Sequence, residues 1–183
     1  MSGDVQHTLT NLSVLDQYAG QAFPPGYPAD RRTFYSPVDD VHGALCEVLN
    51  SAQRSIVIAM YGFDDEDLAG IILTKLRDSN VYVQLTLDKS QAGGVHERTL
   101  LAQENYPVSS VAIGHSERGA IMHLKHGVVD GTILFDGSTN WSTGGETLQD
   151  NQLTVSIDPT MAGMATARIG AIHANMLQKQ AAT

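Results

Sequence analysis

Cysteine is almost absent from the chain, and no long apolar run is present. The single cysteine, Cys46, excludes an internal disulfide framework and is expected to be a small buried side chain of a helix. No apolar stretch approaches the roughly 20 residues that a membrane-spanning helix needs. The first residues lack the basic and apolar regions of a secretory signal, so the sequence as it stands predicts a cytoplasmic protein.

Positive charge is also scarce. The chain has 11 lysines and arginines against 20 acidic residues, a net charge of -9. Nonspecific binding to nucleic acid depends on neutralising phosphates with basic side chains, so this balance argues against a broad nucleic-acid surface. It leaves room for a local basic site that could gather several side chains, namely Lys89, Arg98, His115, Arg118, Lys125 and His126.

The length and the apolar fraction suit one globular domain. The 183 residues are 42% hydrophobic, which is enough for a sizeable core. Residues 1–30 are polar and then rich in proline and glycine, so we assign them to an extended arm whose role the sequence does not reveal. Residues 31–183 are assigned to the folded domain.

Strand and helix periodicities alternate along this domain. The pattern predicts strands at 33–36, 55–60, 81–87, 110–113, 121–124 and 153–157. It predicts helices at 37–50, 65–78, 95–103 and from Pro159 toward the C-terminus. This alternation indicates an α/β fold, a mixed β-sheet flanked by helices on both faces.

Apolar stripes identify the buried faces of two of these helices. The first helix should bury a stripe formed by Val41, Leu45, Val48 and Leu49. The C-terminal helix should bury Met164, Ile169, Ile172 and Met176, and its His173 is predicted to be structural. Four acids, residues 64–67, precede the second helix and are predicted to cap it, since carboxylates suit the positive end of a helix.

One segment places six chemically active residues at a fixed spacing: His123, Lys125, Asp130, Gly137, Ser138 and Asn140. His123 and Lys125 are two residues apart, so on a strand they would leave the same face and meet one substrate group. Leu124 between them would then point into the core. The apolar residues on either side of Asp130-Gly131 predict a hairpin.

The glycine and polar residues at the end of the segment suit an anion. Gly137 would let the backbone approach a ligand closely, while the hydroxyl of Ser138 and the carboxamide of Asn140 would donate hydrogen bonds to phosphate oxygens. If a helix starts near Trp141, its free backbone amides would add to the anion affinity.

This pattern resembles the HKD motif of the phospholipase D superfamily. Similarity extends over about residues 33–177, with Tyr61-Gly-Phe63 and Asp88 resembling flanking features of that family. The resemblance implies a metal-independent phosphodiester hydrolase in which His123 forms a phosphohistidine and the other motif residues bind the phosphate or support the site. Asp130 could instead serve the turn alone. No cofactor is implied, and we assign no metal because the histidines and Cys46 show no close ligand spacing.

The motif occurs once, whereas the family's reaction centre uses two copies. His96-Glu-Arg98 comes closest to a second copy, but it has arginine in place of lysine. The resemblance therefore implies a homodimer with one shared active site on the two-fold axis. One His123 would have to be neutral and its counterpart charged, which predicts a bell-shaped dependence of rate on pH.

One position departs from the family pattern. Family members often carry an acidic residue after the motif that orients the nucleophilic histidine. Counting places Asn151 there, while Asp150 could substitute after a one-residue slip. An asparagine stabilises a charged imidazole less than a carboxylate does, so this departure bears on the rate more than on the type of reaction.

The substrate predicted from these features is nucleic acid, with the chain acting as an endonuclease on DNA or RNA. A phospholipase or phosphatidyl transferase is an alternative, although no basic amphipathic helix is visible that would seat the protein on a membrane. A second alternative is an inactive relative that only binds an anion.

Overall fold

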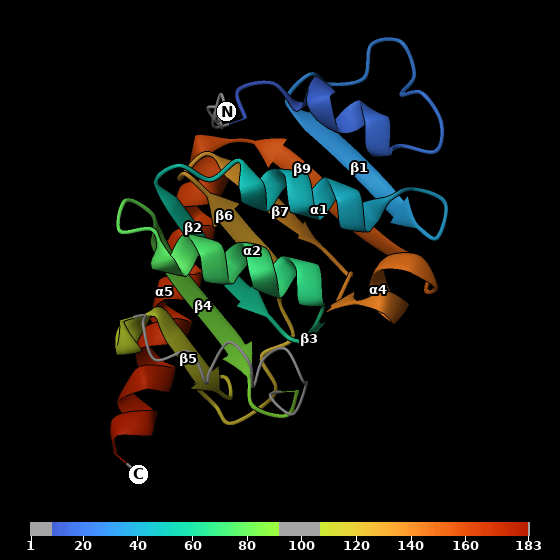
Figure 1. Cartoon of the computed structure of the whole chain (residues 1–183). Helices are drawn as coiled ribbons and strands as arrows, with labels where there is room; N and C mark the ends of the chain where they lie inside the picture. The colour runs from blue at the N-terminus through green and yellow to red at the C-terminus, as the bar shows by residue number, and fades with distance from the viewer. Residues whose placement is uncertain (1–8, 92–106, 183) are drawn as a thin grey trace.

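The computed structural model describes residues 9–91 and 107–182 (Figure 1). In this part of the chain seven strands form one sheet in the order β1-β9-β7-β6-β2-β4-β5. The parallel strands are β2 (Ser55–Met60), β4 (Tyr82–Asp88) and β5 (Val111–Gly114). The antiparallel part consists of β6 (Lys125–Val129), β7 (Ile133–Gly137), β9 (Asn151–Ile157) and β1 (Arg31–Ser36). The helix predicted at 95–103 lies outside the described residues.

Helices cover both faces of this sheet, which confirms the predicted fold class (Figure 1). On one face lie α1 (Val41–Asn50) and α2 (Glu66–Arg77), and on the other lies α5 (Pro159–Ala181). None of the helices in the described residues is both long and apolar enough to cross a membrane. Two short strands, β3 (Phe63–Asp64) and β8 (Trp141–Ser142), pair separately.

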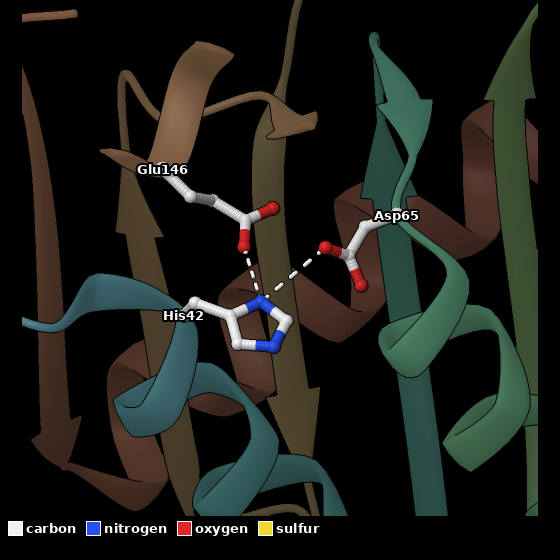
Figure 2. A group of neighbouring side chains, drawn as sticks. All are labelled: His42, Asp65 and Glu146. Carbon is white, nitrogen blue, oxygen red and sulfur yellow. Dashed lines mark hydrogen bonds and ion pairs between the residues drawn. The ribbon is translucent and has the colours of Figure 1, made fainter. Parts of the chain in front are cut away.

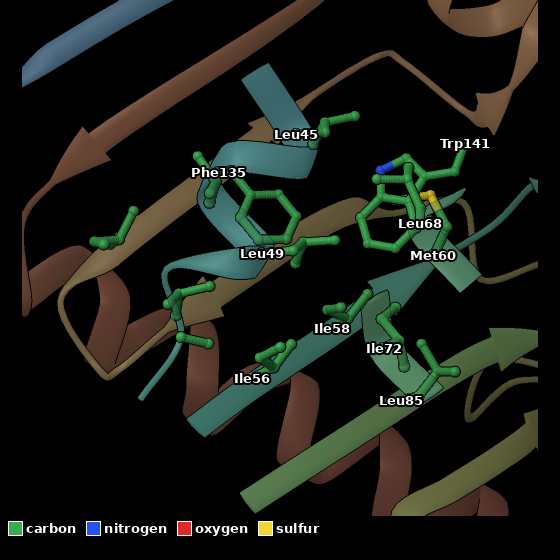
Figure 3. Packing of buried hydrophobic residues seen from close by; sticks show 14 of the residues in the cluster. Leu45, Leu49, Ile56, Ile58, Met60, Leu68, Ile72, Leu85, Phe135 and Trp141 are labelled. Carbon is green, nitrogen blue, oxygen red and sulfur yellow. The ribbon is translucent and has the colours of Figure 1, made fainter. Parts of the chain in front are cut away.

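Strand β2 shows why the sheet needs helices on both sides. Alternate residues Ile56, Ile58 and Met60 belong to the core under α1 and α2, whereas Val57 and Ala59 belong to the core under α5. A continuous apolar strand is what a sheet buried on both faces requires. Figure 3 shows Leu68 and Ile72 of α2 next to Ile58 and Met60 of this strand and Leu49 of α1 next to Phe135 of β7, all in one cluster, and the whole predicted stripe of α1 is buried.

The C-terminal helix begins at Pro159, as predicted, with Asp158 accepting a hydrogen bond from the Met161 amide at 2.9 Å. Ile169, Ile172 and Met176 are buried, but the prediction that Met164 is buried is wrong, because its side chain is 67% exposed. Ala162 and Ala165 fill the stripe at that end of the helix, and Met164 is turned about 100° away from Ala165.

His173 on this helix is buried between strand and loop. Its Nδ1 lies 2.9 Å from the Thr86 hydroxyl and its Nε2 lies 2.7 Å from the Ser109 carbonyl oxygen. Burial lowers the pKa of His173, which favours a neutral ring that both partners hold in place. These contacts fit the structural role predicted from the sequence.

Part of the predicted N-terminal arm is folded against the domain. Residues Leu12–Tyr18 form a short 3-10 helix, η1, and its Leu12 and Leu15 are fully buried in the main core. Asp16 of η1 also pairs with Arg32 of β1 at 2.5 Å. Two leucines are too few to produce a helical pattern in the sequence, so this short helix depends on tertiary packing for its stability.

The hairpin forms as predicted, but the strand before it does not. Asp130 and Gly131 have φ of 53° and 71°, the positive values that tight hairpin turns require. Residues 121–124 are irregular, and β6 starts only at Lys125. Leu124 is 36% exposed instead of buried, and Met122 supplies the apolar contact.

Asp130 anchors this turn to the beginning of β2. Its carboxylate accepts hydrogen bonds from the backbone amides of Gln53, Arg54 and Ser55 at 2.7 to 3.2 Å. The side chain is buried, so these charge-assisted bonds satisfy it where water does not reach.

We expect Asp130→Asn to lower the free energy of unfolding by about 1–3 kcal/mol, because a neutral amide accepts fewer and weaker hydrogen bonds. Asparagine tolerates positive φ, so the variant isolates the loss of the carboxylate. Urea unfolding measures the effect, with the exposed Glu66→Gln as a charge-matched control that should change stability by less than about 0.5 kcal/mol. An Asp130→Asn protein of unchanged stability would contradict this role.

Candidate active site

The candidate site lies at the end of the sheet at which strands β2 and β4 terminate. β2 runs antiparallel to β6, and Met60 at its end pairs with Lys125 at the start of β6. The β6–β7 register pairs His126 with Asp136, so one step further Lys125 comes alongside Gly137. Lys125 and Gly137, which lie 12 residues apart in the sequence, therefore come together at this end of the sheet.

His123 and Lys125 are in direct contact. Lys125 Nζ lies 2.8 Å from His123 Nε2 and donates to the His123 carbonyl oxygen at 3.2 Å. An ammonium can only donate, so Nε2 acts as the acceptor and the proton of a neutral imidazole lies on Nδ1. The lone pair that would attack phosphorus is therefore on the side of the ring that faces the lysine.

Lys125 is a buried cation that forms no ion pair with a carboxylate in the described part of the chain. The residue is 7% exposed, and burial lowers the pKa of its amine. Among the described residues, its polar contacts are those with His123, and its Nζ also lies 4.9 Å from the centre of the Tyr61 ring. A positive charge held by an imidazole and an aromatic ring remains available to an incoming anion.

Tyr61 links the two halves of the site. Its ring packs edge to face against the His123 ring at 4.6 Å, and its amide donates to the Leu124 carbonyl oxygen at 2.9 Å. The next residue, Gly62, lies against Asn140, since a Cβ on Gly62 would be 3.0 Å from the Asn140 carboxamide. The Gly62 carbonyl oxygen also accepts from the Trp141 amide at 2.8 Å.

The end of the motif is fixed by backbone contacts. Gly137 passes so close to Gln152 that a Cβ would collide with the Gln152 carbonyl oxygen. Ser138 Oγ accepts a hydrogen bond from the Gln152 amide at 3.0 Å and donates to Asn151 Oδ1 at 2.8 Å. Asn140 has a buried carboxamide oxygen without a hydrogen-bond partner among the described residues. Not every polar atom of this carboxamide is therefore used in hydrogen bonds within the described residues.

In the structure Asn151 hydrogen-bonds to Ser138, whereas the sequence analysis considered His123 as its partner. Asn151 orients Ser138 through Oδ1, and its Nδ2 donates to the Gly145 carbonyl oxygen at 3.0 Å. Asp150 is exposed and lines a shallow depression with Ser138 and Asn151. In the described part of the chain, neither Asp150 nor Asn151 hydrogen-bonds to His123 of the same molecule.

Asp130 lies outside this site. It follows the last residue of β6, while Lys125 is the first, so the length of the strand separates them. At about 3.3 Å per residue this distance is roughly 16 Å. These contacts fit the alternative that Asp130 serves the turn, because its carboxylate accepts from the amides at the start of β2, and a catalytic role for Asp130 stays a prediction.

Asp88, which the sequence analysis named only as a flanking feature of the family, is a positioning residue. Fully buried at the end of β4, it accepts from the Met122 amide at 2.6 Å, the Ser90 amide at 2.9 Å and the Ser90 hydroxyl at 2.5 Å. The bond to Met122 holds the irregular segment that carries His123. The backbone of this segment is therefore held by contacts at the ends of β2 and β4 and not by pairing with a neighbouring strand.

The acids before α2 lie mainly in a capping arrangement. Asp65 Oδ1 accepts from the Leu68 amide at 2.7 Å, which makes Asp65 the N-cap, and Glu66 and Asp67 lie in the first turn. The capping role predicted for the acidic run is therefore confirmed for Asp65.

A second group of polar residues lies apart from the motif. His42, Asp65 and Glu146 place ligand-type atoms within 4.8 Å of one another (Figure 2). Burial raises the pKa of Glu146 to about 7. Burial acts to lower the pKa of His42, but the Glu146 hydrogen bond and the neighbouring carboxylates raise it overall. The sequence analysis missed this group because its members come from three distant segments.

Comparison with known domains gives one family match. A family model described as the PLD-like domain of cardiolipin synthase matches residues 45–171. This range includes every residue of the motif.

Curated proteins that share sequence with the chain include two mitochondrial cardiolipin hydrolases. The mitochondrial cardiolipin hydrolase of Chlamydomonas reinhardtii is 25% identical over 137 residues, which cover 75% of this chain and 59% of that protein. The Xenopus laevis protein of the same name is 30% identical over 120 residues, 65% of this chain and 53% of its own. The chain thus spans a little over half the length of these curated relatives.

Solved structures share the fold. NucT from Helicobacter pylori superposes with a TM-score of 0.67 at 24% identity, covering 78% of this chain and 94% of that one. Nuc from Salmonella typhimurium, a phospholipase D family member, gives a TM-score of 0.65 at 21% identity, with coverages of 78% and 92%. At these identities the likeness establishes the architecture alone.

The buried Lys125 predicts how anion affinity changes with pH. The protonated amine attracts an oxyanion and the neutral amine does not. The affinity for an anion should therefore be highest below the pKa of Lys125 and fall as the pH rises above it. Because burial lowers this pKa from the usual value near 10.4, the loss begins at a lower pH than for an exposed lysine. We expect tungstate binding to weaken by about tenfold for each pH unit above that pKa.

Calorimetric titration with tungstate between neutral and alkaline pH measures this effect. Lys125→Arg is the matched control, because a guanidinium stays charged over the whole range. A decline common to both proteins would come from another group, so the difference between them isolates Lys125. Equal curves for the two proteins would disprove the assignment.

Proposed function

The chain belongs to the family of phospholipase D-like domains, and from this membership and the geometry of its site we propose that it is a metal-independent phosphodiester hydrolase. The observation that carries the proposal is the 2.8 Å contact between Lys125 Nζ and His123 Nε2. It combines a nucleophile with a fixed positive charge, and a negatively charged phosphodiester needs both.

In the first step, His123 Nε2 attacks phosphorus and forms a P–N bond as the P–O bond to the leaving group breaks. Lys125 shifts from Nε2 to a phosphate oxygen, which frees the lone pair and neutralises developing charge. Ser138 and Asn140 hold the remaining oxygens. A proton donor is required for the leaving oxygen, and water then hydrolyses the P–N bond to regenerate His123.

The proton donor in this proposal is His123 of a second copy. The described residues contain one His-x-Lys motif, so a two-fold axis beside the site would supply the missing imidazole. Ile121 and Leu124, which flank His123, are 50% and 36% exposed. Two apolar side chains next to a polar site fit a surface that a partner subunit covers.

We favour nucleic acid as the substrate. Lys89, His115 and Lys179 line one depression at the ends of β4 and β5, next to the buried Asp88. These groups form a local basic rim on an acidic protein, and a polyanion reaching past the scissile phosphate could contact it. The proposal is therefore an endonuclease on DNA or RNA.

Phospholipid is the second candidate. The matching family model is described from cardiolipin synthase, and both sequence relatives are named cardiolipin hydrolases. The exposed Ile121 and Leu124 beside His123 would suit contact with acyl chains as well as with a partner subunit. The reacting group, a phosphodiester, is the same for both candidates.

We expect hydrolysis in excess EDTA, and we expect His123→Ala to lower it by at least about 1,000-fold. The substrates to compare are plasmid DNA, RNA, cardiolipin vesicles and bis-p-nitrophenyl phosphate, at a temperature where circular dichroism shows a folded protein. His126→Gln is a matched control on the same strand, and it should retain activity because its side chain leaves the opposite face from Lys125.

Activity that survives His123→Ala would remove the proposed nucleophile, and activity lost in EDTA from a folded protein would remove the metal-free mechanism. Cleavage of DNA or RNA supports the favoured substrate. Cleavage of cardiolipin alone would replace it with the second candidate.

Mixing subunits tests the shared site. If each site needs His123 from two chains, a mixture with equal amounts of wild-type and His123→Ala chains should retain about one quarter of the activity, against about one half for independent sites. The chains are co-expressed with different tags, and activity is plotted against the fraction of variant. A linear plot, or activity from a monomer in the ultracentrifuge, would contradict the shared site.

A further inference from the structure

Three elements bring His42, Asp65 and Glu146 together on the face of the sheet opposite α5 (Figure 2). His42 is on α1, Asp65 caps α2, and Glu146 is on α4 (Thr143–Thr147), the short helix after the motif. His42 Nδ1 lies 2.6 Å from Glu146 Oε2 and 3.3 Å from Asp65 Oδ2. One imidazole nitrogen thus faces two carboxylates.

These distances are close to those of a tetrahedral metal site. Ligand atoms about 2.0–2.1 Å from a zinc ion lie roughly 3.3–3.4 Å from one another. The Nδ1 to Asp65 distance already has this value. The distance of 2.6 Å between His42 Nδ1 and Glu146 Oε2 is that of a hydrogen bond. For both atoms to bind one ion, this distance must increase by less than an ångström, or Oε1 must take the place of Oε2.

Glu146 has one carboxylate oxygen that makes no hydrogen bond within 3.5 Å in the described part of the chain, and the nearby Ser142 amide acts only to lower the pKa of this carboxyl. The residue is 1% exposed, and Oε1 has no hydrogen-bond partner. In Figure 2 the carboxylate faces His42 and Asp65, with this second oxygen turned to the Asp65 side. A buried carboxylate oxygen without a donor is costly, and a bound cation would satisfy it.

We propose that His42, Asp65 and Glu146 bind a divalent first-row metal, with Zn²⁺ the preferred ion and water as the fourth ligand. One imidazole and two carboxylates are ligands that zinc accepts. Two carboxylates and a divalent cation also cancel in charge, which resolves the repulsion between two acids held so close together.

The surroundings of His42 suit this role. Its other nitrogen, Nε2, lies 3.4 Å from Asp67 Oδ2 and 3.5 Å from Cys46 Sγ. A metal-bound imidazole commonly donates its second N–H to a carboxylate, which fixes the ring and its tautomer. The His42 side chain is 29% exposed, so an ion can reach the site from solvent.

The metal would act on structure, apart from the chemistry at His123. It would tie α4 to α1 and α2, and α4 supports the motif loop because the Gly145 carbonyl oxygen accepts from Asn151 and Ser36. Binding to the folded state alone stabilises a protein by mass action. The site therefore predicts a zinc-dependent rise in melting temperature.

The test uses the full chain stripped with EDTA and then desalted. We expect it to bind about one zinc ion per chain and to melt about 5–10 °C higher when free zinc is about 100 times the dissociation constant. Cobalt in the same site should give the strong visible absorption of four-coordinate Co²⁺. Glu146→Gln and Asp65→Asn should lose the thermal shift and the absorption.

The variants separate metal binding from folding. Asparagine is as good an N-cap as aspartate, so Asp65→Asn keeps the start of α2 while removing a ligand, even if Glu146→Gln fails to fold. Glu66→Gln is the matched control and should retain the shift, because the exposed Glu66 lies in the first turn of α2 and is not one of the three ligands. An equal shift in all variants, or no shift in the wild type, would overturn the proposal in favour of a proton shared by His42 and Glu146.

Discussion

The antiparallel pairing of β6 with β2 is the constraint on which the site depends. It brings Lys125 next to Met60, at the end where the parallel strands terminate and side chains can converge. It also carries Asp130 to the start of β2, where the carboxylate binds three backbone amides. A sequence motif that looks like one functional unit is thereby divided between two ends of a strand, one for the site and one for the turn.

Two glycines allow backbone segments to pack closely around the site that this strand pairing creates. Gly137 leaves no space for a side chain next to Gln152, so the chain can turn sharply and present Ser138 to the site. A Cβ on Gly62 would come within 3.0 Å of the Asn140 carboxamide, so this glycine also lets two segments pack closely. The glycines of this region are thus required by packing between segments, a reason that the motif alone does not give.

Prediction from the sequence succeeded where local pattern and tertiary packing agree. The apolar run of β2 and the stripe of α1 each determine one structural outcome, and both form as predicted. Residues 121–124 failed because Asp88 and Tyr61 bind their backbone in place of a neighbouring strand. The cluster around His42 could not be predicted at all, since packing of α1, α2 and α4 creates it and no short-range spacing records it.

An acidic protein that is proposed to bind a phosphodiester must separate its charges. The acids of α2 and α4 gather around His42, whereas the basic rim of Lys89, His115 and Lys179 lies at the ends of β4 and β5. Within the site, burial holds Lys125 in place but lowers its pKa, so the protonated amine is less stable there than on an exposed lysine. In a two-fold pocket a second Lys125 would deepen that conflict through repulsion between like charges. A substrate phosphate between the two lysines would reverse it, because the anion restores the stability of both cations. In the proposed two-fold site the lysines would therefore be most fully protonated when substrate is bound, which is when catalysis needs their charge.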